Sequence, residues 1–265
     1  MFPVLLRIGP LTIHTYGFFM AVGVAAALWF IYVQAKKLDY DTNKLLDAAF
    51  WIIVISLLGA KLILFFSHFS YYLENPGELL SLARSGGVFQ GGLTFGLIFA
   101  IIYFRKKKIP FWSTADIVAP AIALGHGFGR LGCFSASCCY GRESSSALAV
   151  VFKSQYAHEL TGVPLATPLY PVQLYESALN FLNFLVLLMI LKRKKFVGQV
   201  FSFYIINYSV IRFFTEYFRG DHGENVYLIK GSSAFNSLSW PQFYCFLGLV
   251  LGIILYQILR RRKSD

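Results

Sequence analysis

Residues 241–263 read PQFYCFLGLVLGIILYQILRRRK, a run without a charged side chain up to residue 259 followed by four basic residues. A helix needs about 20 mostly apolar residues to cross the hydrocarbon core of a bilayer. Lysine and arginine directly after such a run are typical of the cytoplasmic end of a membrane span. This stretch therefore predicts a transmembrane helix whose C-terminal end lies in the cytoplasm.

The same pattern recurs along the rest of the chain. Of its 265 residues, 57% are hydrophobic, 18% aromatic and only 14% charged, which is too little polar surface to cover a soluble globule. Further apolar windows lie at 14–33, 45–66, 88–104, 115–131, 174–191 and 198–218. We therefore expect an all-α integral membrane protein, a bundle of about seven transmembrane helices in a single membrane domain over residues 1–265, with the first helix retained rather than cleaved.

The net charge of +11 is distributed unevenly along the chain. Fifteen of the 24 Lys and Arg residues follow four of the predicted helices, in segments 36–44, 105–108, 192–195 and 260–263. Because positive residues concentrate in cytoplasmic loops, the N-terminus is expected outside and the C-terminus in the cytoplasm, and the charge does not indicate a nucleic-acid partner. The long outside connection, about residues 132–173, includes a predicted strand at 147–152, so we expect a small head or arm over the outer face.

Charged side chains interrupt the sixth apolar window. Arg212, Glu216 and Arg219 follow at i, i+4 and i+7, and Tyr208 lies one turn before them, so all four share one helical stripe. That stripe cannot face lipid, because a charge within a bilayer costs a few kcal/mol or more. Inward-facing charges normally mark a substrate path, and the alternative is an Arg212–Glu216 pair that only fixes helix packing.

The fifth window carries a second polar stripe. Its members follow at steps of three, four and three residues: Gln173, Glu176, Asn180 and Asn183. We expect the two asparagines to form hydrogen bonds between helices. A carboxylate within a membrane helix needs a cationic partner, so Glu176 is expected to pair with Arg130 or Lys61 and to support a site.

Two arginines flank a group of thiols at the outer end of the fourth window. Residues 129–142 read GRLGCFSASCCYGR and contain Arg130, Cys133, Cys138, Cys139 and Arg142. A guanidinium group can engage two phosphate oxygens at once, so Arg130 and Arg212, with Arg142 as a third candidate, predict a phospholipid headgroup site. The C-x4-C-C spacing matches no usual zinc pattern, so we expect no metal and no soluble cofactor; a thiol-redox protein stays an alternative.

Two further segments face the outer side by the same charge argument. The run GGVFQGGL at 86–93 surrounds Gln90 with glycines, which let backbone approach a ligand closely or simply make a tight turn. The N-terminal segment opens the first helix with His14 and Tyr16. An interfacial aromatic belt accounts for Tyr16, while His14 could act in proton transfer if it faces a cavity.

In order along the chain, five blocks resemble the bacterial prolipoprotein diacylglyceryl transferases. They are IGPLTIHTYG at 8–17, GGVFQGGL at 86–93, GRLGCFSASCCYGR at 129–142, YPVQLYE at 170–176 and RFFTEYFRGD at 212–221. The resemblance implies a multi-pass protein of the bacterial cytoplasmic (inner) membrane. It also implies transfer of the diacylglyceryl group of phosphatidylglycerol, a membrane lipid, to the lipobox cysteine thiol at the signal peptide of a prolipoprotein, releasing glycerol phosphate.

The resemblance further implies roles for single residues. Arg130 and Arg212 resemble phosphate-binding arginines of the family, and Glu216 resembles its glutamate of the sixth helix. Tyr16, Gly141 and the signature residues Gln173, Tyr175 and Glu176 match other blocks. The candidate catalytic residues are therefore Tyr16, His14, Gln90, Arg212 and Glu216, and the candidate substrate-binding residues are Arg130, Gly141, Arg142, Gln173, Tyr175, Glu176 and Arg219.

The chain departs from the family pattern at three positions. Gln90 stands where the family commonly has histidine, Cys133 where it has asparagine, and Cys138 where it usually has glutamate. Glutamine cannot act as a base at neutral pH, which leaves His14 or Glu216 as candidates for the general base. A divergent, non-catalytic lipid-binding or transport paralogue stays the alternative to an enzyme.

Overall fold

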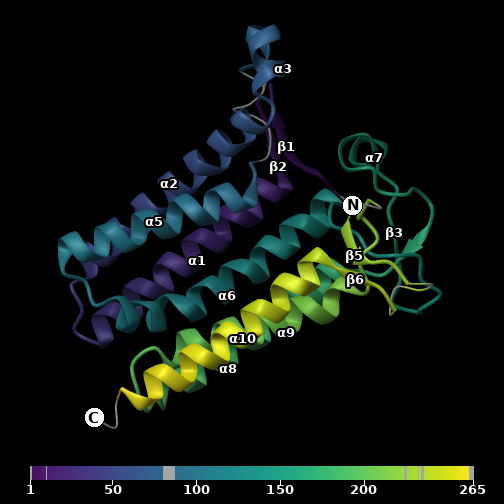
Figure 1. The fold of residues 1–265 in the computed structure, drawn as a ribbon. Helices are drawn as coiled ribbons and strands as arrows, with labels where there is room; N and C mark the ends of the chain where they lie inside the picture. The colour runs from purple at the N-terminus through teal and green to yellow at the C-terminus, as the bar shows by residue number, and fades with distance from the viewer. Residues whose placement is uncertain are drawn as a thin grey trace. The chain divides into compact units, whose positions relative to one another are not determined.

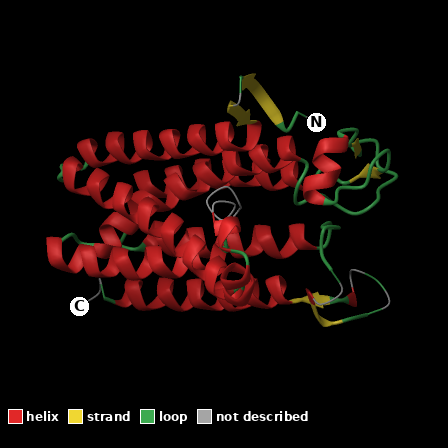
Figure 2. Ribbon diagram, turned by 90° about the horizontal axis from the view of Figure 1, so that it is seen from above, coloured by secondary structure: helices red, strands yellow, loops and turns green. Residues whose placement is uncertain are grey.

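The computed structural model describes residues 2–9, 11–79, 87–223, 226–231, 233 and 236–262. Within these ranges the chain is mostly helical, and strands occur only as three short antiparallel pairs (Figure 1 and Figure 2). The fold divides into two compact units, one made of Met1–Phe30 and Ala115–Asp265 and the other of Ile31–Thr114.

The first unit is built on long helices: the first part of α1 (Thr15–Lys37), most of α6 (Phe111–Ala136), α8 (Val172–Lys192), α9 (Gln199–Glu216) and α10 (Trp240–Arg261). Helix α9 packs along both α8 and α10. Small residues let α10 approach closely, since a Cβ added to Gly252 would lie 2.8 Å from Cγ1 of Ile206. Asn207 Nδ2 donates to Asn183 Oδ1 at 2.9 Å, which confirms the predicted interhelical bond for Asn183. The prediction was wrong for Asn180, which donates to the Glu176 carbonyl of its own helix.

A buried carboxylate joins α6 to the start of α9 at the end of this unit where the basic residues of α8 and α10 lie. Asp116 accepts hydrogen bonds from the backbone N–H groups of Gly198 at 2.8 Å and Phe201 at 3.0 Å. Lys194 Nζ lies 3.2 Å from Asp116 Oδ2. The carboxylate thus meets N–H groups that the first turn of α9 cannot satisfy within the helix.

The second unit contains the end of α1 together with α2 (Thr42–Ser67), α3 (Phe69–Glu74), η1 (Pro76–Glu78) and α5 (Phe89–Lys107). Helices α2 and α5 pack against each other through glycines. A Cβ on Gly91 would lie 2.6 Å from the carbonyl oxygen of Gly59, and one on Gly87 2.6 Å from Cβ of Ala60. The glycines at the start of α5 therefore serve close helix packing. Gly86, which belongs to the same sequence block, lies outside the described residues.

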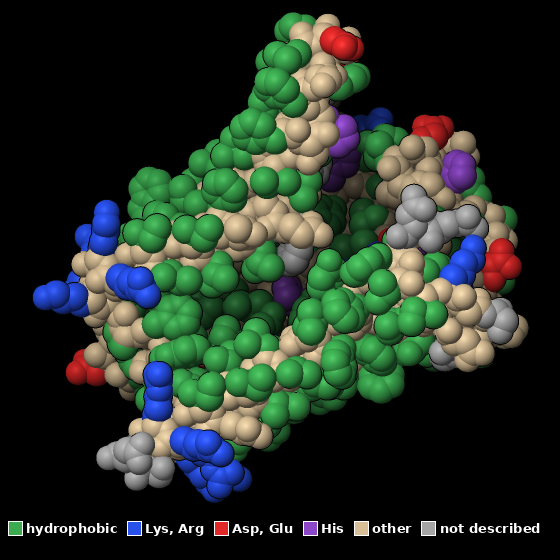
Figure 3. Space-filling model, viewed as in Figure 1, with side chains coloured by type: hydrophobic (Ala, Val, Ile, Leu, Met, Phe, Trp, Pro, Cys, Tyr) green, Lys and Arg blue, Asp and Glu red, His purple; other side chains and the backbone are tan. Residues whose placement is uncertain are grey.

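Each of the seven predicted windows coincides with one long helix: α1, α2, α5, α6, α8, α9 or α10. Windows 14–33, 88–104 and 198–218 extend one or two residues beyond α1, α5 and α9. Among the described residues, five of these are long and apolar enough to cross a membrane, namely α1, α2, α6, α8 and α10. Their exposed side chains include Trp29, Leu57 and Tyr244, at 70%, 63% and 62% exposure, and apolar side chains cover the long helices (Figure 3). Such surfaces need lipid as their solvent, so the chain is a multi-pass membrane protein.

Basic side chains gather at helix ends, as the sequence predicts. The last turn of each of four helices is basic: it contains Lys36 and Lys37 in α1, Arg105 to Lys107 in α5, Lys192 in α8, and Arg260 and Arg261 in α10. In the second unit, the side chain of Asp41 caps α2 by accepting from Lys44 N, and its hydrogen bonds with Lys44 lower the pKa of Asp41. The orientation of these ends in a membrane stays a prediction.

Short strands accompany the helices. Strand β1 (Val4–Ile8) pairs with β2 (Leu11–His14), β3 (Val150–Val151) with β4 (Pro168–Leu169), and β5 (Tyr227–Ile229) with β6 (Leu238–Ser239). Strand β3 lies within the predicted strand at 147–152.

The connection between α6 and α8 forms a small lobe around β3, β4 and α7 (Gln155–Thr161). Its apolar core is made of Phe152, Ala157, Val163 and Leu169. The predicted head is therefore a folded feature with its own core, and its position on the outer face stays a prediction.

Candidate functional site

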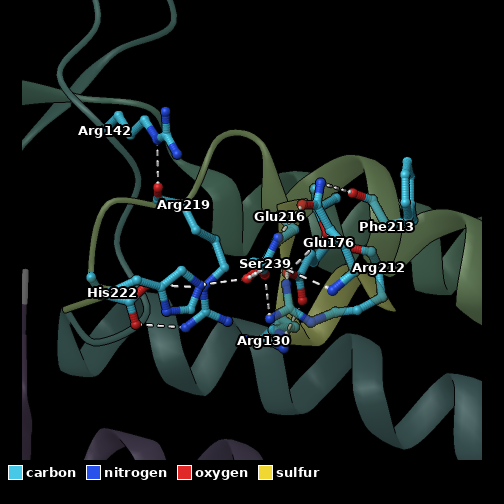
Figure 4. Close-up of polar contacts among 12 residues, drawn as sticks. Arg130, Arg142, Glu176, Arg212, Phe213, Glu216, Arg219, His222 and Ser239 are labelled. Atoms are coloured by element: carbon cyan, nitrogen blue, oxygen red, sulfur yellow. Dashed lines mark hydrogen bonds and ion pairs between the residues drawn. The ribbon is translucent and has the colours of Figure 1, made fainter. Parts of the chain in front are cut away.

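A cluster of two arginines and two glutamates lies inside the first unit (Figure 4). Three helices contribute to it. Arg130 comes from the C-terminal part of α6, Glu176 from the start of α8, and Arg212 and Glu216 from the last turns of α9. The spacing of four residues puts Arg212 and Glu216 on the same face of α9, which packs along α8. The stripe predicted on the sixth helix therefore faces inward at Arg212 and Glu216. The prediction was wrong for Arg219, which lies beyond the end of α9 and so is not on the helical stripe.

The carboxylate of Glu176 joins the two arginines. Its Oε2 lies 2.5 Å from Arg130 Nε, and its Oε1 lies 3.2 Å from Arg212 Nη1. Thr215 Oγ1 also donates to Glu176 Oε1, at 3.1 Å. Arg212 reaches Glu216 with its other terminal nitrogen, Nη2 to Oε2 at 2.6 Å. Both glutamate side chains are only 3% exposed, so these charges are buried as ion pairs. Of the two partners predicted for Glu176, Arg130 is the one that forms an ion pair with it.

Part of the donor capacity of the two arginines is not directed at the two glutamates. A guanidinium group carries five N–H donors, whereas Arg212 directs only two nitrogens at the carboxylates and Arg130 one. The Arg212–Glu216 pair is thus part of a four-residue network rather than an isolated packing contact. The side chains of Arg130 and Arg212 are 19% and 14% exposed, so both are largely but not fully buried.

Glu216 has a second set of partners that sequence reasoning missed. His222 Nε2 lies 2.7 Å from Glu216 Oε1, and Ser239 Oγ donates to the same oxygen at 3.2 Å. Ser239 is also the N-cap of α10 and forms a capping box with Gln242. Ser-x-x-Gln before an apolar run is a sequence signal that could have identified the cap. No periodic signal identifies His222, because it follows the end of α9.

The backbone around Gly141 fixes the loop that carries His222. Gly220 N donates to the Tyr140 carbonyl at 3.0 Å, and Arg142 N donates to the Phe218 carbonyl at 2.9 Å. Only glycine fits at 141, because a Cβ there would collide with the carbonyl oxygen of Tyr170. Gly141 therefore lets the two segments pair, and its role toward substrate stays a prediction.

Arg142 and Arg219 are engaged outside the four-residue cluster. Arg142 Nε donates to the Arg219 carbonyl at 2.8 Å, and its Nη2 donates to the Tyr227 hydroxyl at 3.1 Å. Arg219 forms two hydrogen bonds with Asp221, at 2.9 and 2.5 Å. Burial opposes the charge of Arg219, but Asp221 more than offsets it and raises the pKa of Arg219. The structure thus gives both arginines protein partners, and their role toward substrate stays a prediction.

The signature residues of α8 brace the site. Gln173 is buried and donates from Nε2 to the Cys138 carbonyl at 2.8 Å. Tyr175 packs edge-on against Phe218, with ring centroids 6.4 Å apart. These contacts tie the start of α8 to the turn after α6 and to the end of α9.

The remaining candidates lie at different places. Tyr16 is 41% exposed and lies over Gly132, where a Cβ would be 3.2 Å from Tyr16 Cδ2, so α1 brings it to the end of α6 that carries Arg130. His14 is exposed at the end of β2 and stacks on Tyr156, with ring centroids 6.4 Å apart. Gln90 belongs to the second unit, where it is the second residue of α5 and exposed. Their catalytic roles stay predictions.

Comparison with known proteins matches nearly the whole chain. The family model described as prolipoprotein diacylglyceryl transferase matches residues 3–258. A phosphatidylglycerol–prolipoprotein diacylglyceryl transferase of Clostridium tetani is 34% identical over 265 residues, covering 100% of both chains. The second such transferase of Clostridium perfringens is 32% identical over 256 residues, covering 96% of this chain and 94% of the relative. One from Listeria welshimeri is 31% identical over 268 residues, covering 97% and 90%.

Proposed function

This chain belongs to the prolipoprotein diacylglyceryl transferase family, and we propose that it moves the diacylglyceryl group of phosphatidylglycerol to the lipobox cysteine thiol of prolipoproteins. The donor and the acceptor protein are those in the printed names of its full-length relatives. These full-length matches favour a transferase over a non-catalytic lipid-binding or transport paralogue.

The observation that carries the proposal is the pair of arginines joined on Glu176. Arg130 and Arg212 come from different helices, and their charges converge on one buried carboxylate. A guanidinium group can bind two oxygens of a phospholipid phosphate, just as it can bind the two oxygens of a carboxylate. The phosphate of phosphatidylglycerol therefore binds by taking over guanidinium donors at this point, while the acyl chains stay among the apolar helices.

The reaction needs positive charge where the leaving group forms. The acceptor sulfur attacks the glyceryl carbon that bears the phosphate; a C–S bond forms, the C–O bond breaks, and glycerol phosphate leaves with the electron pair. The headgroup phosphate gains about one negative charge in this step, and fixed cations stabilise that charge most in a site without bulk water. Arg130 and Arg212 supply them.

The thiol must also lose its proton, because the thiolate is the nucleophile. In this proposal His222 accepts the proton and Glu216 orients the imidazole through the 2.7 Å contact at Nε2. This leaves Nδ1 as the nitrogen that takes the proton. A protonated His222 would add one positive charge as the leaving group becomes more negative. Of the two bases predicted from the sequence, Glu216 acts here through His222, and the role of His14 stays a prediction.

The membrane arrangement in this proposal follows the charge distribution. All seven long helices cross the cytoplasmic (inner) membrane, with the N-terminus outside and the lobe between α6 and α8 on the outer face. Fifteen of 24 Lys and Arg residues in four alternate segments support this orientation. Reporter fusions after residues 70, 108, 195 and 262 test it, since an active external reporter after 108, 195 or 262 would contradict it.

The function is tested with purified protein, phosphatidylglycerol in mixed micelles and a peptide containing a lipobox cysteine. We expect the peptide to gain the mass of one diacylglyceryl group and glycerol phosphate to appear in equal amount. A peptide with serine in place of the cysteine is the matched control and should gain nothing. The proposal fails if the cysteine peptide is unchanged while a relative of known activity modifies it under the same conditions.

A further inference from the structure

Three of the four cysteines meet at the end of α6. Cys133 lies in the last turns of the helix, and Cys138 and Cys139 follow in the turn after it. The sulfur atoms of Cys133, Cys138 and Cys139 all lie within 4.8 Å of one another. All three are half-buried and unbridged. Three sulfur atoms at this separation form a set of potential ligands rather than scattered core residues.

The backbone is arranged to fold the turn over the helix end. Ser137 and Cys139 have φ of 60° and 56°, in the left-handed region that residues with a side chain rarely adopt. Cys138 N donates to the Cys133 carbonyl at 3.1 Å, and Gln173 fixes the Cys138 carbonyl from α8. The turn that brings the sulfur atoms together is therefore held by the backbone and by a neighbouring helix, and does not depend on a bound ligand.

The spacing of the sulfur atoms suits one metal ion. Zinc binds thiolate sulfur at about 2.3 Å, so two sulfurs on one tetrahedral zinc lie roughly 3.8 Å apart. The separations in the structure, all within 4.8 Å, exceed this value by about 1 Å at most. A disulfide would use two of the three thiols and leave one over, whereas a metal ion uses all three.

Two arginines belong to the segments next to the cluster. Arg130 lies one turn before Cys133 on α6, and Arg219 pairs through its backbone with Gly141, two residues after Cys139. Three thiolates and a divalent cation carry one net negative charge, which those arginines complement. A hard cation such as Mg²⁺ prefers oxygen ligands, so the sulfur set selects a soft ion.

We propose that Cys133, Cys138 and Cys139 bind one thiophilic cation of the Zn²⁺ class, with a fourth coordination position left for water or another ligand. The site would lie beside Arg130, one turn before Cys133 on α6. The proposal revises the expectation of no metal, which rested on the C-x4-C-C spacing alone. Sequence spacing identifies zinc sites of known motifs, whereas here the turn after α6 produces the proximity.

The test uses the full-length protein, reduced and freed of metal, and two probes. Titration with Cd²⁺ should give the ultraviolet charge-transfer band of thiolate–cadmium bonds, saturating at one ion per chain. Zn²⁺ should then protect Cys133, Cys138 and Cys139 from alkylation, as read by mass spectrometry, and leave Cys245 reactive. Cys245→Ser, which changes the remaining cysteine in α10, is the matched control and should bind as the wild type does.

Cys133→Ser, Cys138→Ser and Cys139→Ser should each weaken Cd²⁺ binding at least tenfold. The variant with all three substitutions should lose the thiolate–cadmium charge-transfer band. The proposal is overturned if the triple variant keeps the band, or if the reduced wild type binds no Cd²⁺. The protection pattern needs no variant, so equal alkylation of the cluster cysteines with and without Zn²⁺ would also overturn it if a serine variant failed to fold.

Discussion

Two buried carboxylates in the first unit lie toward opposite ends of α6 and do different things. Asp116, with a fully buried side chain, accepts from two backbone N–H groups at the start of α9 and pairs with Lys194. Glu176, 3% exposed, is held by side chains: Arg130, Arg212 and Thr215. Backbone donors cannot leave their carboxylate without opening the fold, whereas a guanidinium can turn to a ligand. Buried charge alone thus does not mark a site; the type of partner does.

The largest effect is expected from removing one of the two arginines. Arg212→Ala should lower transfer roughly 1,000-fold, because the leaving phosphate loses a preorganised cation. Arg212→Lys keeps the charge but cannot bridge Glu176 and Glu216 as a planar fork, so it should fall between alanine and wild type. The rate of diacylglyceryl addition to the peptide measures both. Near-wild-type transfer by the folded alanine variant would remove this cluster as the phosphate site.

A smaller effect, with a distinct pH signature, is expected at His222. His222→Gln should slow transfer roughly 100-fold at neutral pH, as loss of a general base does. The deficit should narrow as pH rises toward the ordinary thiol pKa of about 8.5, because the acceptor thiol then ionises without help. The ratio of wild-type to variant rates across pH is the readout. A ratio that stays constant with pH would mean that His222 only supports the loop. His158→Gln, in the lobe, is the matched control.

The comparison of the two carboxylates can be tested directly with matched amides. Glu176→Gln should lower kcat about tenfold by misplacing the arginines, with KM for phosphatidylglycerol unchanged or lower because two cations lose a competing anion. Asp116→Asn should instead lower the stability of the folded protein by about 1–2 kcal/mol and leave transfer per folded molecule near wild type. Thermal unfolding of both variants measures the change in stability, and steady-state kinetics measures the change in kcat and KM. If the two variants exchanged these effects, the assignment of structural and functional carboxylates would be wrong.

The smallest effect is expected at the helix caps. Ser239→Ala and Ser154→Ala each remove an N-cap hydroxyl, at α10 and α7, and should each cost about 1 kcal/mol of stability. Only Ser239 also donates to Glu216, so only Ser239→Ala should lower transfer, and by a few-fold. Equal activity of the two variants would show that the contact to Glu216 has no functional weight.

Much of the fold could be predicted because membrane insertion depends on a local property. The free energy of placing a segment in lipid is close to a sum over its residues, so apolar windows located the seven long helices found in the described part of the chain. Among the described residues, α5 and α9 are not among the helices that length and composition alone identify as candidate membrane spans. In α9 the charged residues Arg212 and Glu216 contribute to this difference.

The site was predicted in part. An inward stripe on α9 and a cationic partner for Glu176 follow from the cost of an unpaired charge in lipid, and the structure identifies the partner as Arg130. The contact of His222 with Glu216 could not be predicted. It depends on how the chain turns after α9 and pairs with the segment around Gly141, which is a contact between residues far apart in sequence.

The sequence by itself determined that the chain is a membrane protein and which segments form its long helices. It also determined which charged residues must face inward and which family the chain resembles. These follow from composition, period and ordered motifs, each readable within a short window. Only the tertiary structure decided that Asp116 accepts from backbone N–H groups while Glu176 pairs with arginines. It also decided that His222 contacts Glu216 and that the sulfur atoms of three cysteines lie close together. Pairing of buried polar groups is decided by where separate helices and turns meet, and no local sum of residue energies contains that information.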